Sequence, residues 1–219
     1  MTYAADTADC LFDLVSDELL NYPVDDENIA CEMINANLIL CDPTKNTMCQ
    51  CRRKMPIRYA IGELLWYNSR RPDWKSISPY SKFWKNISDD GEHVNSNYGW
   101  CIHDKYTFDQ WKMVRELLQK DPNSRQAVIH IKEPRDVVNR PSKDINCTIA
   151  MQFLLRNNKL DLIVTMRSND IWLGLPYDLF NFTCMQIQMA MELGVEIGTY
   201  YHNAGSLHLY KKDKEKLSC

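Results

Sequence analysis

The sequence predicts a single α+β domain. Apolar residues recur at helical spacing through much of the first half, and three strand-like segments follow one another in the second half. Helices and strands that come in groups, and do not alternate strictly, are typical of this class. The 219 residues are 45% hydrophobic, and no linker-like stretch divides them. A chain of this length can bury a large core without disulfides, so we expect one domain over residues 1–219.

The first half is expected to be mainly helical. Three segments place apolar side chains three or four positions apart, the spacing of one helical face: residues 7–21, 57–68 and 106–119. Thr7 or Asp9 is the expected N-cap of the first of these helices, and Asp121-Pro122 closes the third. Between the first two helices, residues 23–54 mix short apolar runs with Pro, Asp and Asn. This mixture predicts one or two strands and a mobile loop around Asp42–Gln50.

The second half is expected to be mainly extended. Three segments read as strands: residues 125–132, 148–155 and 160–166. Asn157-Asn158 is the expected hairpin turn between the last two strands. Residues 177–193 are apolar on nearly every side, which predicts a buried helix. A strand over residues 196–203 and a lysine-rich helix over residues 206–218 complete the prediction.

The composition argues against two classes of protein. With 26 basic and 29 acidic residues the net charge is −3, which does not suit the broad basic face of a non-specific nucleic-acid-binding protein. No apolar run reaches the roughly 18 residues of a membrane span, and the polar residues 1–9 do not resemble a signal peptide. The nine cysteines are odd in number and irregularly spaced, so we expect reduced thiols in a cytoplasm.

Cys49 and Cys51 form a C-x-C pair. Two unrelated thiols explain this pair more simply than a zinc site, because no second ligand pair follows at finger-like spacing. We therefore expect no metal.

Four features could carry chemistry, although each has a simpler structural explanation when taken alone. Cys147 opens an expected strand and could be a small buried hydrophobe. Asp178 stands at the start of an expected helix, where an acidic residue favours the helix dipole. Glu63 interrupts an apolar helical segment, and burial there would raise the pKa of its carboxyl toward the range of proton transfer. Arg167–Asp170 is either a solvated strand end or an anion site, since a guanidinium donates in pairs.

Taken together and in order, several short sequence motifs give the chain a resemblance to the thymidylate synthase family from about Leu11 to Tyr210. The words shared with the family are Glu63-Leu64-Leu65-Trp66, Tyr98-Gly99, Asp121-Pro122-Asn123-Ser124-Arg125, Cys147 followed by Gln152-Phe153, Arg167-Ser168-x-Asp170, Leu173-Gly174-Leu175-Pro176 and His208-x-Tyr210. Three further words look like the phage deoxycytidylate hydroxymethylase branch: Asn95–Trp100, Met166–Asp170 and Gly205–His208. The resemblance implies a mixed twisted sheet covered by helices, with one sheet face forming a homodimer interface.

The resemblance implies a covalent reaction at a pyrimidine nucleotide. Cys147 matches the family's nucleophile, which adds to C6 of the base, so that C5 attacks the one-carbon unit of 5,10-methylenetetrahydrofolate. The thiolate is the reactive form, so a nearby cation is expected to lower the pKa of Cys147. Glu63 matches the glutamate that organises water and moves protons at the base.

The implied nucleotide site includes a residue from a second subunit. Arg167 matches the phosphate-binding arginine near the nucleophile, and Arg125 matches one that reaches the partner's phosphate site. The family's second arginine beside Arg125 is here Gln126, and Lys45, Arg52 and Arg53 are only candidates for the family's mobile arginine loop. His208 and Tyr210 match the pair that holds the sugar hydroxyl. Ser168 and Gln152 complete this implied nucleotide site.

The implied folate site lies beside the nucleotide. Asp170, Leu173 and Gly174 match the family's folate-side wall, and Tyr177 and Trp84 are candidates for it.

Asp178 departs from the synthases, which have asparagine at this position when they use deoxyuridylate. One oxygen of a carboxyl group can accept from cytosine N4–H₂ while the other shares a proton with N3. Mispairing a buried polar group costs about 1–3 kcal/mol. Asp178 therefore favours a cytidylate as substrate. Thr148 also departs from the family, which has histidine there, and no role follows for it.

The sequence ends at Cys219, nine residues after Tyr210, whereas the synthases continue to a tail that excludes water. Hydride transfer needs a dry site, so a shortened chain favours capture by water and a 5-hydroxymethyl product.

The expected activity is that of a deoxycytidylate 5-hydroxymethyltransferase in a cytoplasm, that of the host if the protein is viral. A ribonucleotide hydroxymethylase, a shortened synthase that makes a 5-methyl product, and a non-catalytic nucleotide-binding relative are the alternatives. No membrane or direct nucleic-acid partner is expected.

Overall fold

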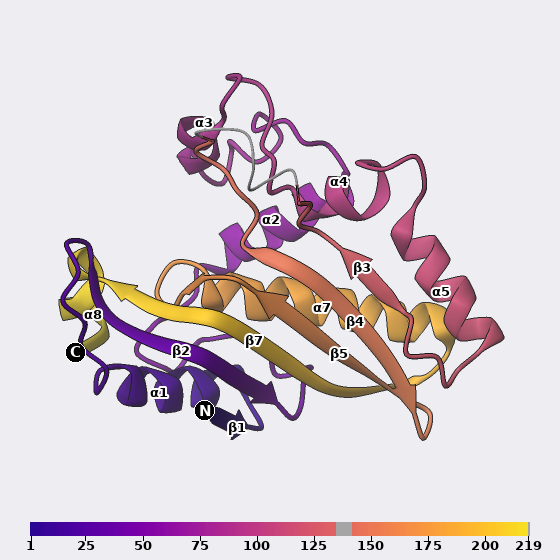
Figure 1. Cartoon of the computed structure of the whole chain (residues 1–219), viewed down its shortest axis with the longest axis horizontal. Helices are drawn as coiled ribbons and strands as arrows, with labels where there is room; N and C mark the ends of the chain where they lie inside the picture. Colours follow the sequence, from indigo (N-terminus) through magenta and orange to yellow (C-terminus); the bar gives the residue numbers. More distant parts are fainter. Residues whose placement is uncertain (135–141, 219) are drawn as a thin grey trace.

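The fold is built on one mixed sheet. The computed structural model describes residues 1–134 and 142–218. The strands stand in the order β1–β2–β7–β5–β4–β3, and β6 pairs with the second half of β7 (Figure 1). Their bounds are Thr2–Ala5 for β1, Ile29–Leu40 for β2, Val128–His130 for β3, Thr148–Arg156 for β4, Lys159–Met166 for β5, Asn169–Asp170 for β6 and Glu196–Tyr210 for β7.

The pairing is partly parallel and partly antiparallel, as the α+β prediction requires. The β1–β2 and β5–β7 pairs are parallel, whereas β2–β7, β4–β5 and β3–β4 are antiparallel. The β4–β5 hairpin turns at Asn157 and Asn158, whose φ values of 49° and 60° are left-handed. Asparagine tolerates this conformation better than most residues, so the predicted turn is confirmed for the reason that predicted it.

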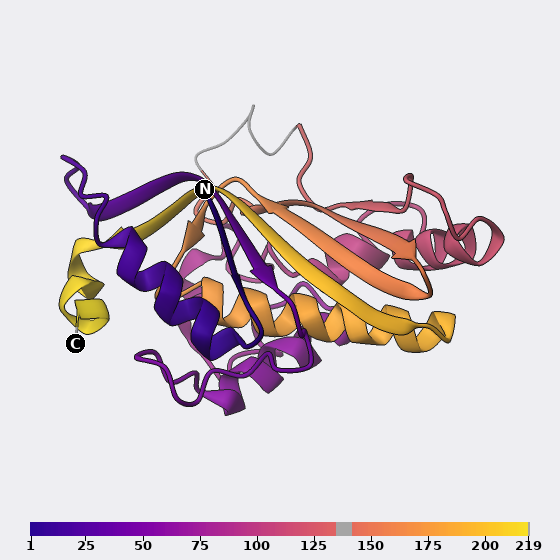
Figure 2. The ribbon, with the colours of Figure 1, turned by 90° about the horizontal axis from the view of Figure 1, so that it is seen from below.

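Helices cover one face of the sheet. Their bounds are Ala8–Leu19 for α1, Ile57–Asn68 for α2, Phe83–Ile87 for α3, Tyr98–His103 for α4, Gln110–Lys120 for α5, Leu175–Leu193 for α7 and Lys214–Ser218 for α8. Figure 2 shows α1, α2 and α7 on the same side of the strands. Over the ranges that the structure describes, the opposite face of the central strands carries no helix. That face is the one expected to meet a second subunit.

The long helix α7 forms the centre of the core. It begins with Pro176 in its first turn and ends at Gly194, whose φ of 68° is left-handed. Both residues suit these positions, because proline lacks an amide hydrogen and glycine has no Cβ to clash. Leu179, Phe182 and Met189 are fully buried against the sheet. The predicted buried helix over residues 177–193 is therefore confirmed, with two more residues at its start.

Two expectations about the remaining elements are wrong. The helix expected over residues 206–218 is a strand up to Tyr210, followed by a 3-10 turn over Lys211–Asp213 and the short α8. Alternate residues of this strand, Leu207 and Leu209, pack into the core while the backbone pairs with β2. Residues 125–132 form only the short β3.

The loop expected to be mobile is tied to α1. The backbone amides of Cys49, Gln50 and Cys51 all donate to Oδ1 of Asp9, at 2.9, 3.0 and 2.9 Å. These three bonds hold the pKa of Asp9 below its usual value, although burial acts the other way. The C-x-C pair is thus part of an anchored turn. Among residues 1–134 and 142–218, no cluster of His, Cys, Asp and Glu could hold a metal ion.

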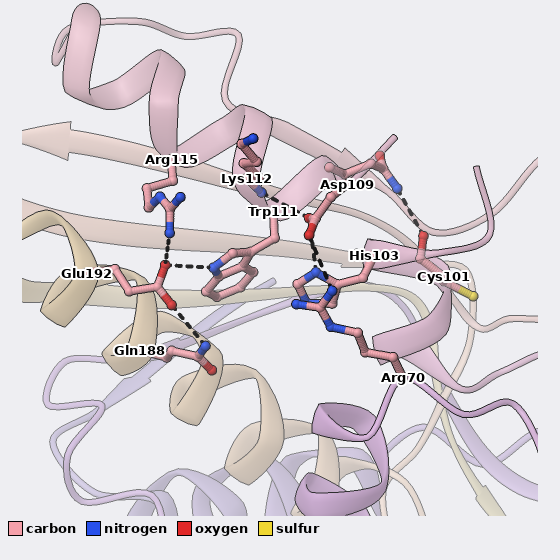
Figure 3. A network of polar contacts seen from close by, with 10 residues as sticks. Arg70, Cys101, His103, Asp109, Trp111, Lys112, Arg115, Gln188 and Glu192 are labelled. Carbon is pink, nitrogen blue, oxygen red and sulfur yellow. Dashed lines mark hydrogen bonds and ion pairs between the residues drawn. The ribbon is translucent and has the colours of Figure 1, made fainter. Parts of the chain in front are cut away.

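A polar network fastens α5 to its neighbours (Figure 3). Asp109 caps the helix by accepting from Lys112 N at 3.0 Å, and the same carboxylate lies 3.0 Å from His103 Nδ1 on α4. Farther along, Trp111 donates to Glu192 of α7 at 3.0 Å. The α4–α5 region is therefore held against the end of α7 that is remote from Asp178.

Two further observations concern the class of protein. Within the described ranges, no helix is long and apolar enough to cross a bilayer. The eight cysteines that the structure describes are all free thiols.

Candidate active site

The site is assembled where β5 gives way to β6 alongside β7. β5 pairs with β7 as far as Met166 and Ala204, and β6 then pairs Asp170 with His208. Arg167 lies in the break between the two strands, and its backbone amide donates to Cys147 O at 2.8 Å. Gly205 of β7 lies close to the Arg167 backbone, because a Cβ at this position would be only 3.0 Å from Arg167 O. The expected nucleophile and the expected phosphate-binding arginine are thus neighbours.

The side chains of Cys147 and Arg167 are also close. Arg167 Nη2 lies 3.6 Å from Cys147 Sγ. The guanidinium is oriented by two backbone carbonyls, because Nε donates to Asn146 O at 3.1 Å and Nη2 to Ile145 O at 2.9 Å. Burial nevertheless raises the pKa of Cys147; Arg167 lowers it in part, and Asp178 and Asp144 raise it further. The expected fall in the pKa of this thiol is therefore wrong for the unliganded protein.

Glu63 is buried and held by two donors. It is 5% exposed on α2. Tyr59 Oη donates to its Oε1 at 2.9 Å, and Asn181 Nδ2 donates to its Oε2 at 2.8 Å. Burial raises the pKa of Glu63 to about 7, against the effect of these hydrogen bonds. Such a carboxyl can hold or release a proton near neutral pH.

Asp178 lies in the first turn of α7 and is half-buried. Its Oδ2 accepts from Asn169 Nδ2 at 2.7 Å. Burial and then the charge of Glu63 raise the pKa of Asp178 to about 8, while the bond from Asn169 lowers it. Asp178 therefore interacts electrostatically both with Glu63 and with Cys147, although the three residues come from separate parts of the fold.

The expected sugar-binding residues lie on the last part of β7. His208 is buried, and its ring meets that of Tyr210 edge to face at 5.0 Å. His208 Nδ1 is buried and has no hydrogen-bond partner in the parts of the chain described. Tyr210 is within the electrostatic influence of Cys147 and Arg167. Ser168 lies next to Arg167 and is half-buried.

Arg125 and Gln152 lie outside this cluster. Gln152 Nε2 donates to Arg125 O at 2.9 Å, and Arg125 is exposed just before β3. Gln152 is half-buried on the face of β4 opposite to the core side chains Met151 and Phe153. The single subunit does not bring these two residues to Cys147.

The expected folate-side residues meet around Tyr59. The Tyr177 ring packs edge to face on Tyr59 at 4.6 Å, and Trp84 Nε1 donates to Tyr59 Oη at 3.0 Å. Tyr59 thus joins the two aromatic candidates to Glu63.

Asp170 closes the other side of this wall by accepting from the backbone amides of Trp172 and Leu173 at 2.8 and 3.2 Å. These bonds hold the turn in which Leu173 is 45% exposed. A Cβ at Gly174 would lie only 3.0 Å from Asn169 Nδ2 and 3.3 Å from Asp178 Oδ2. Gly174 therefore also protects the Asn169–Asp178 contact.

The candidates for the arginine loop are engaged elsewhere. Lys45 pairs with Asp42 at 3.1 Å, and Arg52 pairs with Asp13 at 3.6 Å and with Asp17. Arg53 lies over the Trp172 ring at 5.0 Å and donates to Tyr177 Oη at 3.2 Å. Only Arg53 is therefore near a predicted site residue, on the folate side.

Sequence reasoning gave no role to several polar residues around the site. Tyr59 and Asn181 hold Glu63, and Asn169 holds Asp178. Buried His202 contacts Asn169 in turn. The available signal for His202 was its place between Tyr200 and Ala204 on the core face of a predicted strand, where a polar side chain needs a partner.

The arrangement of this site agrees with its sequence relationships. The chain belongs to the thymidylate synthase family, whose profile matches residues 25–219. Within that family, the deoxyuridylate hydroxymethyltransferase of Bacillus phage SP01 is 36% identical over 184 residues, which cover 78% of this chain and 48% of that protein. The deoxycytidylate 5-hydroxymethyltransferase of Enterobacteria phage T4 is 29% identical over 165 residues, 70% of this chain and 67% of that protein. The chain thus spans about half the length of the first relative and two thirds of the second.

Proposed function

We propose that this protein is a folate-dependent deoxycytidylate 5-hydroxymethyltransferase. The observation that carries the proposal is the carboxyl of Asp178, whose pKa of about 8 keeps a proton available at neutral pH. A protonated carboxyl can donate to N3 of cytosine and accept from N4–H₂ at the same time. Proton transfer to N3 would neutralise the charge that develops on the ring when a thiolate adds to C6.

Cys147 is the nucleophile of this proposal. Its Sγ releases its proton to water and bonds to C6, the electron pair of the C5–C6 double bond moves toward N3, and N3 takes the proton of Asp178. Arg167, 3.6 Å from Sγ, stabilises the thiolate that precedes the bond. The pKa of Cys147 is raised in the unliganded protein, so the thiolate is a minor species before the nucleotide binds.

Glu63 is the proton carrier on the other side of the base. Methylenetetrahydrofolate, bound between Asp170, Leu173, Tyr177 and Trp84, supplies the one-carbon unit that joins C5. The half-buried aromatic rings and the exposed Leu173 side chain suit a flat pterin. C5 would then lose its hydrogen as a proton, and the bond between the one-carbon unit and the folate nitrogen would break to release tetrahydrofolate. Water would add to the methylene carbon left on C5, and Cys147 would leave C6 as the C5–C6 double bond returns. Glu63, with a pKa of about 7, can exchange protons with that water.

The phosphate completes the proposed substrate. Arg167, Ser168, His208 and Tyr210 lie along one edge of the β6–β7 region. Gln152 lies on the face of β4 opposite to the core side chains, and it donates to Arg125 O at 2.9 Å. We infer that a second copy of the chain packs on this face and supplies Arg125 to the phosphate, which makes the protein a homodimer.

Deoxyuridylate is the second candidate substrate. It is favoured by the SP01 relative, a deoxyuridylate hydroxymethyltransferase that is 36% identical to this chain. The ribonucleotide CMP is a further candidate substrate, because the pair of His208 and Tyr210 does not indicate whether the site admits a 2′-hydroxyl.

The test is mass analysis of products. The protein is incubated with methylenetetrahydrofolate and dCMP, dUMP or CMP in separate reactions. The expected result is 5-hydroxymethyl-dCMP with tetrahydrofolate. A 5-methyl product with dihydrofolate would instead mean hydride transfer, and a product from dUMP alone would overturn the cytosine assignment. A protein that turns over none of the three would be a nucleotide-binding relative, and the enzymatic proposal would fail.

A further inference from the structure

Four buried or half-buried polar side chains form one continuous chain behind the base-reading residue. Tyr200 Oη lies 2.9 Å from His202 Nδ1, and His202 Nε2 lies 3.1 Å from Asn169 Oδ1. Asn169 Nδ2 then donates to Asp178 Oδ2 at 2.7 Å. Tyr200 and His202 are fully buried and Asn169 is 3% exposed. The chain therefore runs from the core under β7 to the edge of the proposed base pocket.

The donor and acceptor roles in this series of hydrogen bonds can be assigned. Burial lowers the pKa of His202 to about 4, so its ring is neutral and carries one N–H. Burial also raises the pKa of Tyr200 well above its usual value, so the phenol keeps its proton. In the described residues the Tyr200 hydroxyl contacts only His202, and a buried hydroxyl without an acceptor is costly. Tyr200 therefore donates to Nδ1, and the single N–H of His202 stands on Nε2.

The position of the proton on His202 in turn fixes the donor and acceptor roles at Asn169 and Asp178. His202 Nε2–H donates to Asn169 Oδ1, which fixes the orientation of the amide and aims Nδ2 at Asp178 Oδ2. An oxygen that accepts from an amide is a poor place for a proton, so the proton of the Asp178 carboxyl belongs on Oδ1.

The position of that proton matters for the choice of base. A neutral carboxyl offers one donor and one acceptor. With the donor opposite N3 it matches cytosine, and with the acceptor opposite N3 it matches uracil. A carboxyl free to carry its proton on either oxygen would accept both bases, whereas one with a fixed proton matches only one of them.

We propose that Asn169, oriented by His202 and Tyr200, is a positioning residue that fixes the proton on Oδ1 of Asp178 and so determines which pyrimidine the site selects. This inference rests on the proposed role of Asp178 in reading the base. It adds that Asn169, His202 and Tyr200 support Asp178 in that role.

The test compares the affinities of dCMP and dUMP, measured by calorimetry, and the ratio of kcat/KM for the two nucleotides. Asn169→Leu and His202→Leu interrupt the chain, and each is expected to reduce the wild-type preference roughly tenfold, which corresponds to the loss of one oriented hydrogen bond. His202→Gln keeps an amide N–H that can donate to Asn169, and it is expected to restore most of the preference. Tyr200→Phe removes only the terminal hydroxyl group, and it should lower the preference while the protein stays folded.

A matched control is Gln186→Leu, which removes another fully buried amide. Gln186 Nε2 donates to Leu160 O and Thr199 O at 2.9 and 3.2 Å and makes no contact with Asp178. It should lower the melting temperature without changing the preference. Equal losses for both nucleotides in Asn169→Leu and Tyr200→Phe would overturn the inference, and so would a His202→Gln variant no better than His202→Leu.

Binding and turnover separate the two proposals. If the product is not a 5-hydroxymethyl nucleotide but Asn169→Leu still changes the binding ratio, the proposed function fails and this inference stands. A wild-type protein that binds both nucleotides equally, or neither of them, overturns the inference whatever the product.

Discussion

Arg167 Nη2 lies 3.6 Å from Cys147 Sγ, yet the pKa of the thiol is raised. The guanidinium is partly engaged by the carbonyls of Ile145 and Asn146, and burial opposes the thiolate more strongly than one exposed cation supports it. The positive charge is therefore close to the sulfur, but it does not outweigh the effect of burial on the pKa of the thiol.

The first prediction follows from this pair. Alkylation of Cys147 by iodoacetamide, followed by peptide mass analysis, should be slow at neutral pH and should accelerate as the pH rises past the usual range of a thiol. Arg167→Leu removes the larger of the two charges that lower the pKa of Cys147, the other being Lys132. The midpoint of the pH profile should therefore move upward, whereas Arg167→Lys should move it less. A downward shift in Arg167→Leu would contradict this account. Cys10, which is exposed, serves as the internal reference.

The second prediction concerns stability and Glu63. The pKa of its carboxyl is raised from 4.5 to about 7 by burial, so between these values the folded protein binds more protons than the unfolded chain. Stability should therefore fall as the pH rises through this window. The contribution of Glu63 to that fall is at most about 3 kcal/mol. Urea unfolding at pH 5 and pH 8 should show a smaller difference for Glu63→Gln than for the wild type.

Glu192 provides the control for this experiment. Its pKa is lowered, although burial acts in the other direction, because Gln188, Trp111 and Arg115 donate to it. Glu192→Gln should thus leave the loss of stability between pH 5 and pH 8 in place. If Glu63→Gln keeps the full wild-type difference, the Glu63 carboxyl is not the group responsible.

The third prediction tests the base-reading residue directly. Asp178→Asn replaces a carboxyl with an amide, and Asn169 Nδ2 would then face either the oxygen or the nitrogen of that amide. We expect the kcat/KM ratio of dCMP to dUMP to fall by roughly 5–150-fold, the effect of mispairing one polar group. The ratio is measured by tritium release from nucleotides labelled at C5. An unchanged ratio would mean that other groups read the base.

The fourth prediction concerns Gly174, which has an ordinary φ of −94° and so needs no glycine for its backbone. An alanine Cβ would lie 3.0 Å from Asn169 Nδ2 and 3.3 Å from Asp178 Oδ2, closer than the two groups tolerate without shifting. Gly174→Ala should weaken dCMP binding measurably in calorimetry. Gly194→Ala is the comparison, since nothing lies within 4 Å of its Cβ although its φ of 68° costs stability. Normal binding in Gly174→Ala would show that the Asn169–Asp178 contact is dispensable.

The sequence predicted those features that depend on local pattern. The helix over residues 57–68 is predicted to the residue, because its apolar side chains recur at helical spacing. The strand ending at Tyr210 was predicted as a helix from residue 206, because its lysine-rich end resembles a helix and its extended form depends on pairing with β2. Long-range pairing of this kind leaves little trace in the local pattern.

The candidate site also has features that the sequence predicted and features that depend on the three-dimensional fold. The resemblance named Cys147, Glu63 and Asp178 by matching short motifs, and in the structure Asp178 interacts electrostatically with each of the other two. It could not provide the direction of the Cys147 pKa shift, which depends on burial. Nor could it connect Asn169 with His202, which are 33 positions apart along the chain and meet only through the pairing of β6 with β7.

The last prediction tests the shared site. Cys147→Ser and Arg125→Ala should each have low activity as pure proteins, because one lacks the nucleophile and the other lacks a phosphate contact. If Arg125 serves the neighbouring subunit, a mixed dimer contains one site with both Cys147 and Arg125 intact.

Random exchange between equal amounts of the two variants should then restore about a quarter of the wild-type activity, since half of the dimers are mixed and half of their sites are complete. The recovery is measured after mild denaturation and refolding of the mixture. The control is a mixture of Cys147→Ser with Arg167→Ala, whose two mutated side chains lie in one site. Both sites of this mixed dimer are damaged, one at Cys147 and the other at Arg167, so this mixture should recover no activity. The discriminating arm is the double variant Cys147→Ser/Arg125→Ala mixed with wild type. It damages both sites of every mixed dimer, so activity should fall below that of wild type mixed with Cys147→Ser alone. Equal activity of these last two mixtures would mean that Arg125 acts within its own subunit.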